Sequence, residues 1–240
     1  MPNYPPPAVD NVIWSEEQSG ALYTQRYKQY RMPGEPETQI DGLIKKSGSY
    51  GTGSACKGDP NNCMYIWYEG SDSAVCKLSG NQGVIDRIPI PAPLAITISA
   101  VLDAGSQSGT LTVKAVLDDV LQPDSGTVNK IWVGLYERGV QSSYGKDSIL
   151  YPAVVRTQLV FSNFTVTQAG AETTFTAPFT LDPTWVPENI GALAFVQNYN
   201  GSSSTDPSKL IAGEVYNAGY LQSVIAPPPG SGHIRPVSHP

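Results

Sequence analysis

The stretch from Thr173 to Asn198 constrains the fold of this chain most. Its first half alternates apolar residues with threonine or proline, the apolar ones being Phe175, Ala177, Phe179 and Leu181. This period of two is typical of a half-buried β-strand. Its second half, Ile190 to Val196, is apolar on both faces, which suits a central strand covered on two sides. The turn over residues 182–189 carries two prolines, which cannot continue a ladder. The pattern predicts a strand–turn–strand hairpin at the core of a β-sandwich.

Further strands are expected on both sides of this stretch. A proline-rich junction over residues 84–93 is followed by predicted strands over 94–100, 111–117, 130–138, 154–164 and 210–216. With the two strands of the first stretch this makes about seven, without the alternating helices of βαβ units. We therefore expect a mainly β protein, built on an antiparallel β-sandwich.

The residues before the sandwich differ in character. Residues 1–14 are proline-rich and read as an extended arm, and residues 226–240 form a similar tail. A capping pattern at Ser15 and helical spacing after it predict a helix from about Glu16 to Tyr30, followed by a short strand over 37–42 and a loop-like stretch over 43–83. The expected organisation is an arm (1–14), an N-terminal α/β region with a cysteine-containing loop (15–88), the sandwich (89–225) and a tail (226–240).

The three cysteines, Cys56, Cys63 and Cys76, cluster in this loop-like stretch. Such clustering favours one disulfide and an oxidising compartment. A Cys56–Cys63 bridge would close a small loop and a Cys63–Cys76 bridge would staple a hairpin, and the spacing does not choose between them. A metal site would need a fourth ligand, and no histidine lies near, so no metal is predicted.

Several function classes conflict with the composition. The two histidines, His233 and His239, both lie in the tail, which leaves no Ser-His-Asp or Cys-His site in the folded body. Spacing alone does not exclude the paired carboxylates of a glycoside hydrolase, but no pair stands out, and we predict no catalytic residues, no cofactor and no enzymatic activity. A net charge of −6 without a basic stripe disfavours a nucleic-acid partner. The sequence lacks an 18-residue apolar segment, so no transmembrane helix is expected.

Two groups of charged residues invite a functional interpretation. Glu137 and Arg156 lie on neighbouring predicted strands, and a cross-strand ion pair inside or at the rim of the sandwich is favoured over a charged active site. Asp118, Asp119 and Asp124 could ligate calcium in a loop. They lack the Asp-x-Asp-x-Asp-Gly pattern, so solvated turn residues are the favoured interpretation.

Three uncharged residues are candidate surface sites. Trp185, in its proline-flanked turn, is either an exposed platform for carbohydrate or, as we favour, a lid that closes one end of the core. Asn200 and Asn163 each match the N-glycosylation acceptor pattern. Asn200 is the better candidate because it sits in a Gly/Ser loop, whereas Asn163 is expected in a strand.

Part of the N-terminal region resembles the second half of a thioredoxin fold. A helix ending in aromatic residues is followed by Pro36, at the place of that fold's cis-proline, and by a strand closing with Ile40-Asp41-Gly42. The family usually has threonine after this proline, where this chain has Glu37. The family's first half, with its redox Cys-x-x-Cys, is not in this sequence. The resemblance therefore implies only a partial thioredoxin-like part.

The sandwich half resembles a family of secreted or lipid-anchored outer-membrane proteins of about twenty-eight kilodaltons, in which a thioredoxin-like domain precedes a β-sandwich. The resemblance covers roughly residues 15–42 and 84–221, and its motifs occur in the family's order: Pro93-Leu94-Ala95-Ile96, Trp132-Val133-Gly134-Leu135-Tyr136-Glu137, Val154-Val155-Arg156, Leu181-Asp182-Pro183-Thr184-Trp185 with Glu188-Asn189, and Ala194-Phe195-Val196-Gln197-Asn198. The resemblance implies an extracytoplasmic location, extracellular or at the cell surface. It also implies the architecture of the sandwich, but it does not point to a particular activity.

These observations predict a secreted, non-enzymatic structural or interaction protein. We expect it to self-assemble as the repeating subunit of an extracellular filament or surface layer, with its proline-rich termini and sheet edges docked on neighbouring copies. One alternative is a monomeric accessory domain of an envelope lipoprotein that binds carbohydrate or protein. The other is a thioredoxin-like thiol-disulfide protein that uses the three cysteines.

Overall fold

The computed structural model describes residues 21–30, 37–40, 44–47, 90–103, 105–144, 147–201 and 210–225. The predicted arm and tail, Pro36 and the cysteines Cys56, Cys63 and Cys76 lie outside these residues, as do both histidines. The interpretations that rest on them, including the disulfide and the thioredoxin-like part, stay predictions.

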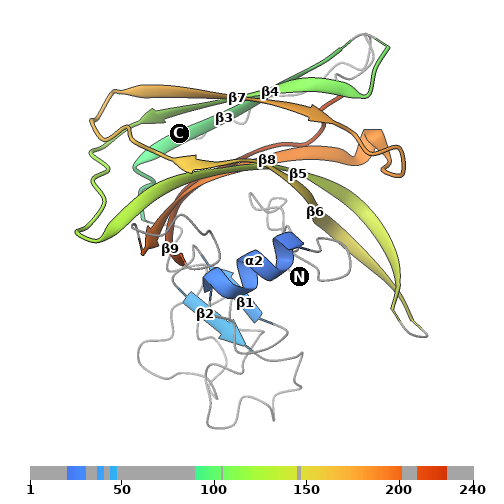
Figure 1. Cartoon of the computed structure of the whole chain (residues 1–240), viewed down its shortest axis with the longest axis horizontal. Helices are drawn as coiled ribbons and strands as arrows, with labels where there is room; N and C mark the ends of the chain where they lie inside the picture. Colours follow the sequence, from blue (N-terminus) through green and yellow to red (C-terminus); the bar gives the residue numbers. More distant parts are fainter. Residues whose placement is uncertain are drawn as a thin grey trace, which may run out of the picture.

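Seven of the described strands form a sandwich of two antiparallel sheets (Figure 1). One sheet has the order β3-β4-β7, with β3 at Leu94–Leu102, β4 at Ser108–Leu117 and β7 at Glu172–Thr180. The other has the order β6-β5-β8-β9, with β5 at Thr127–Tyr144, β6 at Asp147–Asn163, β8 at Ile190–Asn200 and β9 at Ile211–Leu221. The predicted mainly β, antiparallel sandwich is confirmed.

The prediction of a hairpin between residues 173 and 198 is wrong. β7 pairs with β4, whereas β8 pairs with β5 and β9 in the other sheet. The turn between them, which includes the short 3-10 helix η2 (Pro187–Asn189), therefore carries the chain from one sheet to the other. Two packed sheets lie about 10 Å apart, and an eight-residue turn with two prolines is long enough to span that gap but unsuited to a tight hairpin.

The main core lies between the two sheets, where alternate residues of facing strands meet. It combines Leu111, Val113 and Leu117 of β4 with Ile131, Val133 and Leu135 of β5 and with Ile190, Ala192, Ala194 and Val196 of β8. Truncating one of these fully buried leucines to alanine is expected to cost about 2–5 kcal/mol of stability.

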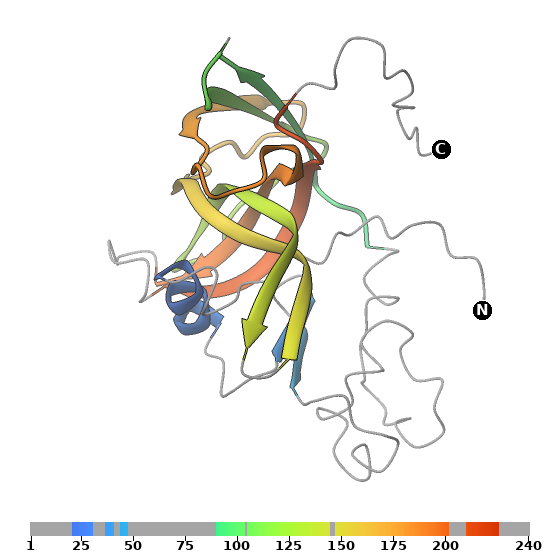
Figure 2. The same cartoon turned by 90° about the vertical axis from the view of Figure 1, so that its right-hand side faces the viewer.

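The helix α2 (Ala21–Tyr30) covers the opposite face of the four-stranded sheet (Figure 1 and Figure 2). Beneath it Trp132, Val155 and Phe195 form a second buried cluster, and Leu22 of the helix packs against this cluster. β8 is thus covered on both faces, as its apolar run from Ile190 to Val196 predicts. None of the helices in the described residues is long and apolar enough to span a bilayer.

A small hairpin completes the described N-terminal part. β1 (Glu37–Ile40) pairs antiparallel with β2 (Ile44–Ser47). The first strand was predicted, but residues 44–47 were expected to be loop-like, and this part of the prediction is wrong. β2 has only four residues, and two of them are lysines. Its alternation of apolar and polar residues is therefore too weak to be recognised from the sequence.

Candidate binding groove on the open side of the sandwich

The two lateral sides of the sandwich differ in how closely the sheets approach. On one side β3 and β9 lie together: the side-chain amide of Asn217 donates a 2.6 Å hydrogen bond to the carbonyl oxygen of Leu94. Gly219 lies so near Ile96 that a β-carbon there would be 2.8 Å from the Ile96 carbonyl oxygen. On the other side β6 and β7 are the edge strands, and no described strand pairs with the outer edge of either.

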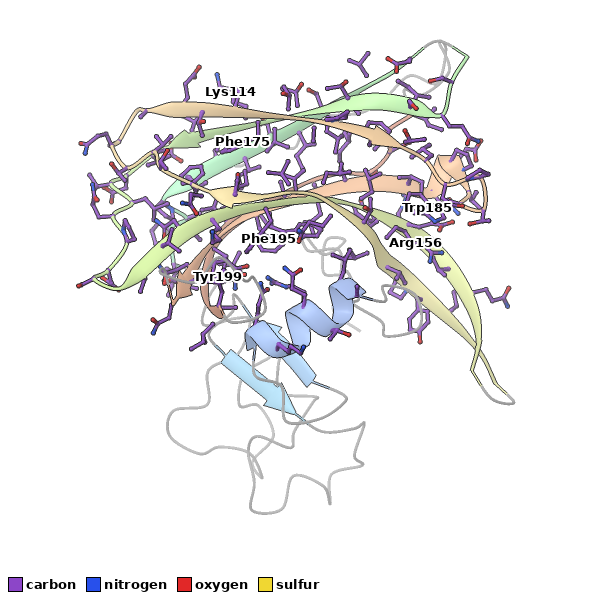
Figure 3. All side chains as sticks on the ribbon, in the orientation of Figure 1. Lys114, Arg156, Phe175, Trp185, Phe195 and Tyr199 are labelled. Atoms are coloured by element: carbon purple, nitrogen blue, oxygen red, sulfur yellow. The ribbon has the colours of Figure 1, made fainter. Side chains whose placement is uncertain are left out.

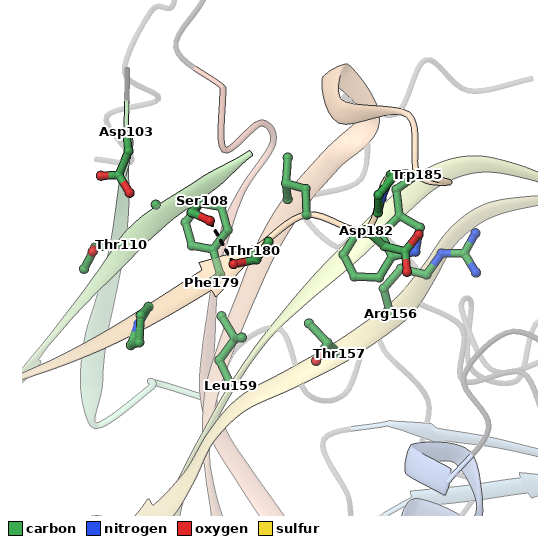
Figure 4. Close-up of a pocket in the computed structure, with 14 residues that line it drawn as sticks. Asp103, Ser108, Thr110, Arg156, Thr157, Leu159, Phe179, Thr180, Asp182 and Trp185 are labelled. Carbon is green, nitrogen blue, oxygen red and sulfur yellow. Dashed lines mark hydrogen bonds between the residues drawn. The ribbon is translucent and has the colours of Figure 1, made fainter. Parts of the chain in front are cut away.

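An open pocket of about 830 Å³ lies on this second side (Figure 4). Leu159 of β6 and Phe179 of β7 line its middle, Asp103 lies toward one end, and Arg156, Asp182 and Trp185 lie together at the other. We call it the β6–β7 groove, defined by these six residues. It offers an aromatic ring, apolar walls and two carboxylates to a ligand.

The turn that carries Trp185 is held by hydrogen bonds around Asp182. One carboxylate oxygen of Asp182 accepts hydrogen bonds from the hydroxyl of Thr184 at 2.6 Å and from its backbone N–H at 2.8 Å. The Trp185 N–H donates to the Asp182 carbonyl oxygen at 3.0 Å. The hydrogen bond from the Thr184 hydroxyl contributes most to lowering the pKa of Asp182, and the bond from the Thr184 backbone N–H comes second. Both lower it because they stabilise the ionised carboxylate. Asp182 is therefore an anion at neutral pH.

A buried ion pair fixes the same turn to the four-stranded sheet. Arg156 donates to one carboxylate oxygen of Glu137 from Nε at 2.8 Å and from a terminal nitrogen at 2.7 Å. The other oxygen of Glu137 accepts the backbone N–H of Val186 at 2.9 Å. The cross-strand ion pair predicted from the sequence is confirmed, and it is more than a strand-to-strand contact, because Glu137 also positions the residue after Trp185.

Trp185 itself belongs both to the core and to the groove. It is partly buried, packs against the main core and lines one end of the groove. Figure 3 shows it at the same end of the sandwich as Arg156. The core contact agrees with a lid role, and the surface-binding role stays a prediction.

The other candidate residues are scattered. Asn163 ends β6 and accepts a 2.7 Å hydrogen bond from Lys130, whereas Asn200 is the exposed last residue of β8. The aspartates Asp118, Asp119 and Asp124 are exposed residues outside the strands, as the solvated-turn interpretation expects. In the described part of the chain no cluster of histidine, cysteine or acidic residues could hold a metal ion.

Sequence reasoning missed one polar cluster beneath α2. Arg26, which is 4% exposed, donates hydrogen bonds to the side-chain oxygens of Gln29, Gln197 and Tyr199 at 3.0, 3.2 and 2.8 Å. Its guanidinium carbon lies 5.1 Å from the centre of the Phe195 ring. Phe195 and Tyr199 face the helix in Figure 3. The available signal was the polar Gln197 directly after the apolar run from Ile190 to Val196, since a buried polar side chain requires a partner.

Comparison with known proteins gives no family. No family model matches the chain, and no curated protein matches it in sequence. Among solved structures, the chain is similar to a domain of the outer membrane lipoprotein Omp28 from Porphyromonas gingivalis, with 19% identity, a TM-score of 0.37, and coverage of 56% of this chain and 90% of that chain. It is also similar to Spo0M, a sporulation control protein from Bacillus subtilis, with 13% identity, a TM-score of 0.32, and coverage of 56% and 50%. Neither likeness assigns an activity to this chain.

Proposed function

We propose that this chain is a non-enzymatic interaction protein of the cell exterior whose sandwich binds an extended polypeptide segment in the β6–β7 groove. One observation carries the proposal: the sandwich is closed along β3 and β9 but open between the edge strands β6 and β7, where the groove lies. The extracytoplasmic location rests on the sequence motifs shared with the outer-membrane family described above.

The open side has the chemistry that an extended polypeptide needs. An edge strand keeps an outward row of backbone donors and acceptors, and an extended segment can add to it while its side chains enter pockets. Trp185 and Leu159, both partly buried, can receive apolar side chains, and either Asp103 or Asp182 can receive a cationic one.

Both edge strands contain a proline, Pro152 in β6 and Pro178 in β7. A proline is tolerated in an edge strand because its missing N–H faces away from the ladder. A proline has no N–H, so each of these strands has one backbone donor fewer, which limits indiscriminate pairing with other strands. It follows that side-chain contacts in the groove, rather than a long backbone ladder, select the partner.

The test is selection of a displayed library of random peptides of about twelve residues on the full-length chain. Enriched peptides should bind the Trp185→Ala variant at least about tenfold more weakly, as expected for truncation of an aromatic anchor. Tyr220→Ala is the matched control, because Tyr220 is an exposed aromatic residue on β9, at the closed side. No enrichment, or equal binding to Trp185→Ala and the unaltered chain, would refute the proposal.

Carbohydrate is a second candidate ligand, favoured by one feature of the groove. Trp185, Asp182 and Arg156 lie together at one end of the groove (Figure 4), where an aromatic side chain is accompanied by charged groups. A glycan array probed with the full-length chain tests it. Carbohydrate is the better-supported ligand if the peptide selection fails and glycan binding is lost in Trp185→Ala but retained in Tyr220→Ala.

A further inference from the structure

We infer that the β6–β7 groove receives residues 226–240 of a second copy of this chain, so that the groove and the tail together form a self-assembly contact. This inference rests on the proposed function, because it names the extended segment that the groove binds. Three observations lead to it: the place where the chain leaves the sandwich, the charge of the groove, and the composition of the tail.

The described fold ends beside the turn that forms one end of the groove. The Val224 N–H donates a 2.9 Å hydrogen bond to the carbonyl oxygen of Ile190, the first residue of β8, and Val224 is buried in the main core. Ile190 directly follows the turn that carries Asp182 and Trp185. The tail therefore departs from the same end of the sandwich that carries the aromatic and acidic part of the groove.

The charge of the groove selects between the two proline-rich segments. Arg156 is already paired with Glu137, so the carboxylates of Asp103 and Asp182 dominate the charge presented to a ligand. Residues 226–240 contain Arg235 and two histidines but no acidic residue. Residues 1–14 contain one aspartate and no basic residue. Opposite charges attract across a partly desolvated contact, which favours the tail as occupant.

The composition of the tail suits a groove that cannot rely on a backbone ladder. Proline-rich segments dock on aromatic-lined grooves through side chains and carbonyl groups, and they need few N–H donors of their own. Ile234, Pro236 and Val237 flank Arg235, so one short stretch offers apolar groups for Trp185 and Leu159 and a cation for Asp182.

The order of residues in the tail favours a second copy over the same chain. Three consecutive prolines, 227–229, follow almost directly on Ile225. Prolines favour an extended rod of about 3.1 Å per residue. A stretch with this preference suits a segment that reaches a neighbouring copy. The Gly230-Ser231-Gly232 link and the Arg235 stretch come only after it.

The first test uses a fluorescent synthetic peptide of residues 226–240 and the full-length chain, with binding followed by anisotropy. We expect saturable binding that weakens about tenfold in Asp182→Asn and in Trp185→Ala. Asp119→Asn is the matched control: Asp119, like Asp182, is exposed and accepts a hydrogen bond from a nearby backbone N–H, but it lies outside the groove. A tail peptide with Arg235→Ala should bind the unaltered chain more weakly by about the same factor. When this peptide is combined with Asp182→Asn, the total loss of affinity should be no larger than either single loss, because both changes remove the same contact. A peptide of residues 1–14 should not bind.

The second test is sedimentation of the full-length chain over a range of concentrations. Association should increase with concentration and be lost in the Arg235→Ala chain. If library peptides bind the groove but the tail peptide does not, the inference fails and the proposed function stands. If neither binds, both fail. If the tail peptide binds in a groove-dependent way but the chain stays monomeric well above the peptide's Kd, the occupant is not a second copy, and the inference is overturned.

Discussion

Asp182 shapes the groove at the scale of a single carboxyl group. Its ionised form accepts both bonds from Thr184, so its pKa is lower in the folded chain than in the unfolded chain. A carboxyl of this kind contributes stability above its unfolded pKa of about 4, and that contribution is lost as the pH falls through the lower folded value. We expect carbon NMR of the Asp182 carboxyl to show a pKa below the ordinary range and a rise toward it in Thr184→Val. The account is wrong if Thr184→Val leaves the pKa unchanged.

Glu137 connects the Trp185 turn to the four-stranded sheet. The Glu137→Gln substitution removes the negative charge from a nearly buried pair, so the desolvation of Arg156 is no longer offset by its Glu137 partner. We expect a loss of about 3 kcal/mol in the free energy of unfolding, measured with urea. Glu172→Gln provides the comparison, because the cross-strand pair of Glu172 and Lys114 is largely exposed. That change should cost less than about 1 kcal/mol. Equal losses would contradict the assigned role of Glu137.

At the scale of elements, α2 depends on Arg26 to hold it against the sheet. Hydrogen bonds of a charged donor to buried acceptors contribute about 1.5–3 kcal/mol each, and Arg26 makes such bonds to Gln197 and Tyr199 of β8. In Arg26→Met we expect amide exchange in residues 21–30 to accelerate at least about tenfold, while the strands of the main core keep their protection. Lys28→Met, at an exposed position of the same helix, should have little effect. Uniform acceleration through the sandwich would show that α2 is not a separate unit.

The strands were predictable from sequence because alternation reports which face of a strand is buried. Leu111, Val113 and Leu117 define β4, and the uninterrupted apolar run from Ile190 defines a strand covered on both sides. Alternation does not show which strands pair with each other. The turn after Leu181 was therefore assigned to a hairpin, whereas it carries the chain from one sheet to the other. The groove was equally inaccessible, because it brings Leu159 and Phe179 together from edge strands that no hydrogen-bonded ladder connects.

At the scale of the whole molecule, the two sheets meet on the closed side, where β3 and β9 lie together. Gly219 allows this closure, because a β-carbon at that position would lie 2.8 Å from the side chain and from the carbonyl oxygen of Ile96. A contact this short with backbone cannot be relieved by rotating a side chain, so β9 would have to move away from β3. Gly213, in the same strand, is a matched comparison, because its added β-carbon would lie 3.3 Å from the Asn198 carbonyl oxygen.

We therefore expect Gly219→Ala to lower the free energy of unfolding by about 1–3 kcal/mol, the usual cost of overpacking, and Gly213→Ala to lower it less. The position of the groove adds a second consequence. If β3 and β9 act as the fixed side of the sandwich, separating them changes the spacing between β6 and β7 as well. The folded Gly219→Ala chain should then bind groove ligands more weakly than the Gly213→Ala chain, although neither glycine lines the groove. Thermal unfolding and peptide anisotropy on the same two variants measure both effects. A stability loss without a binding difference would show that the two sides of the sandwich are independent.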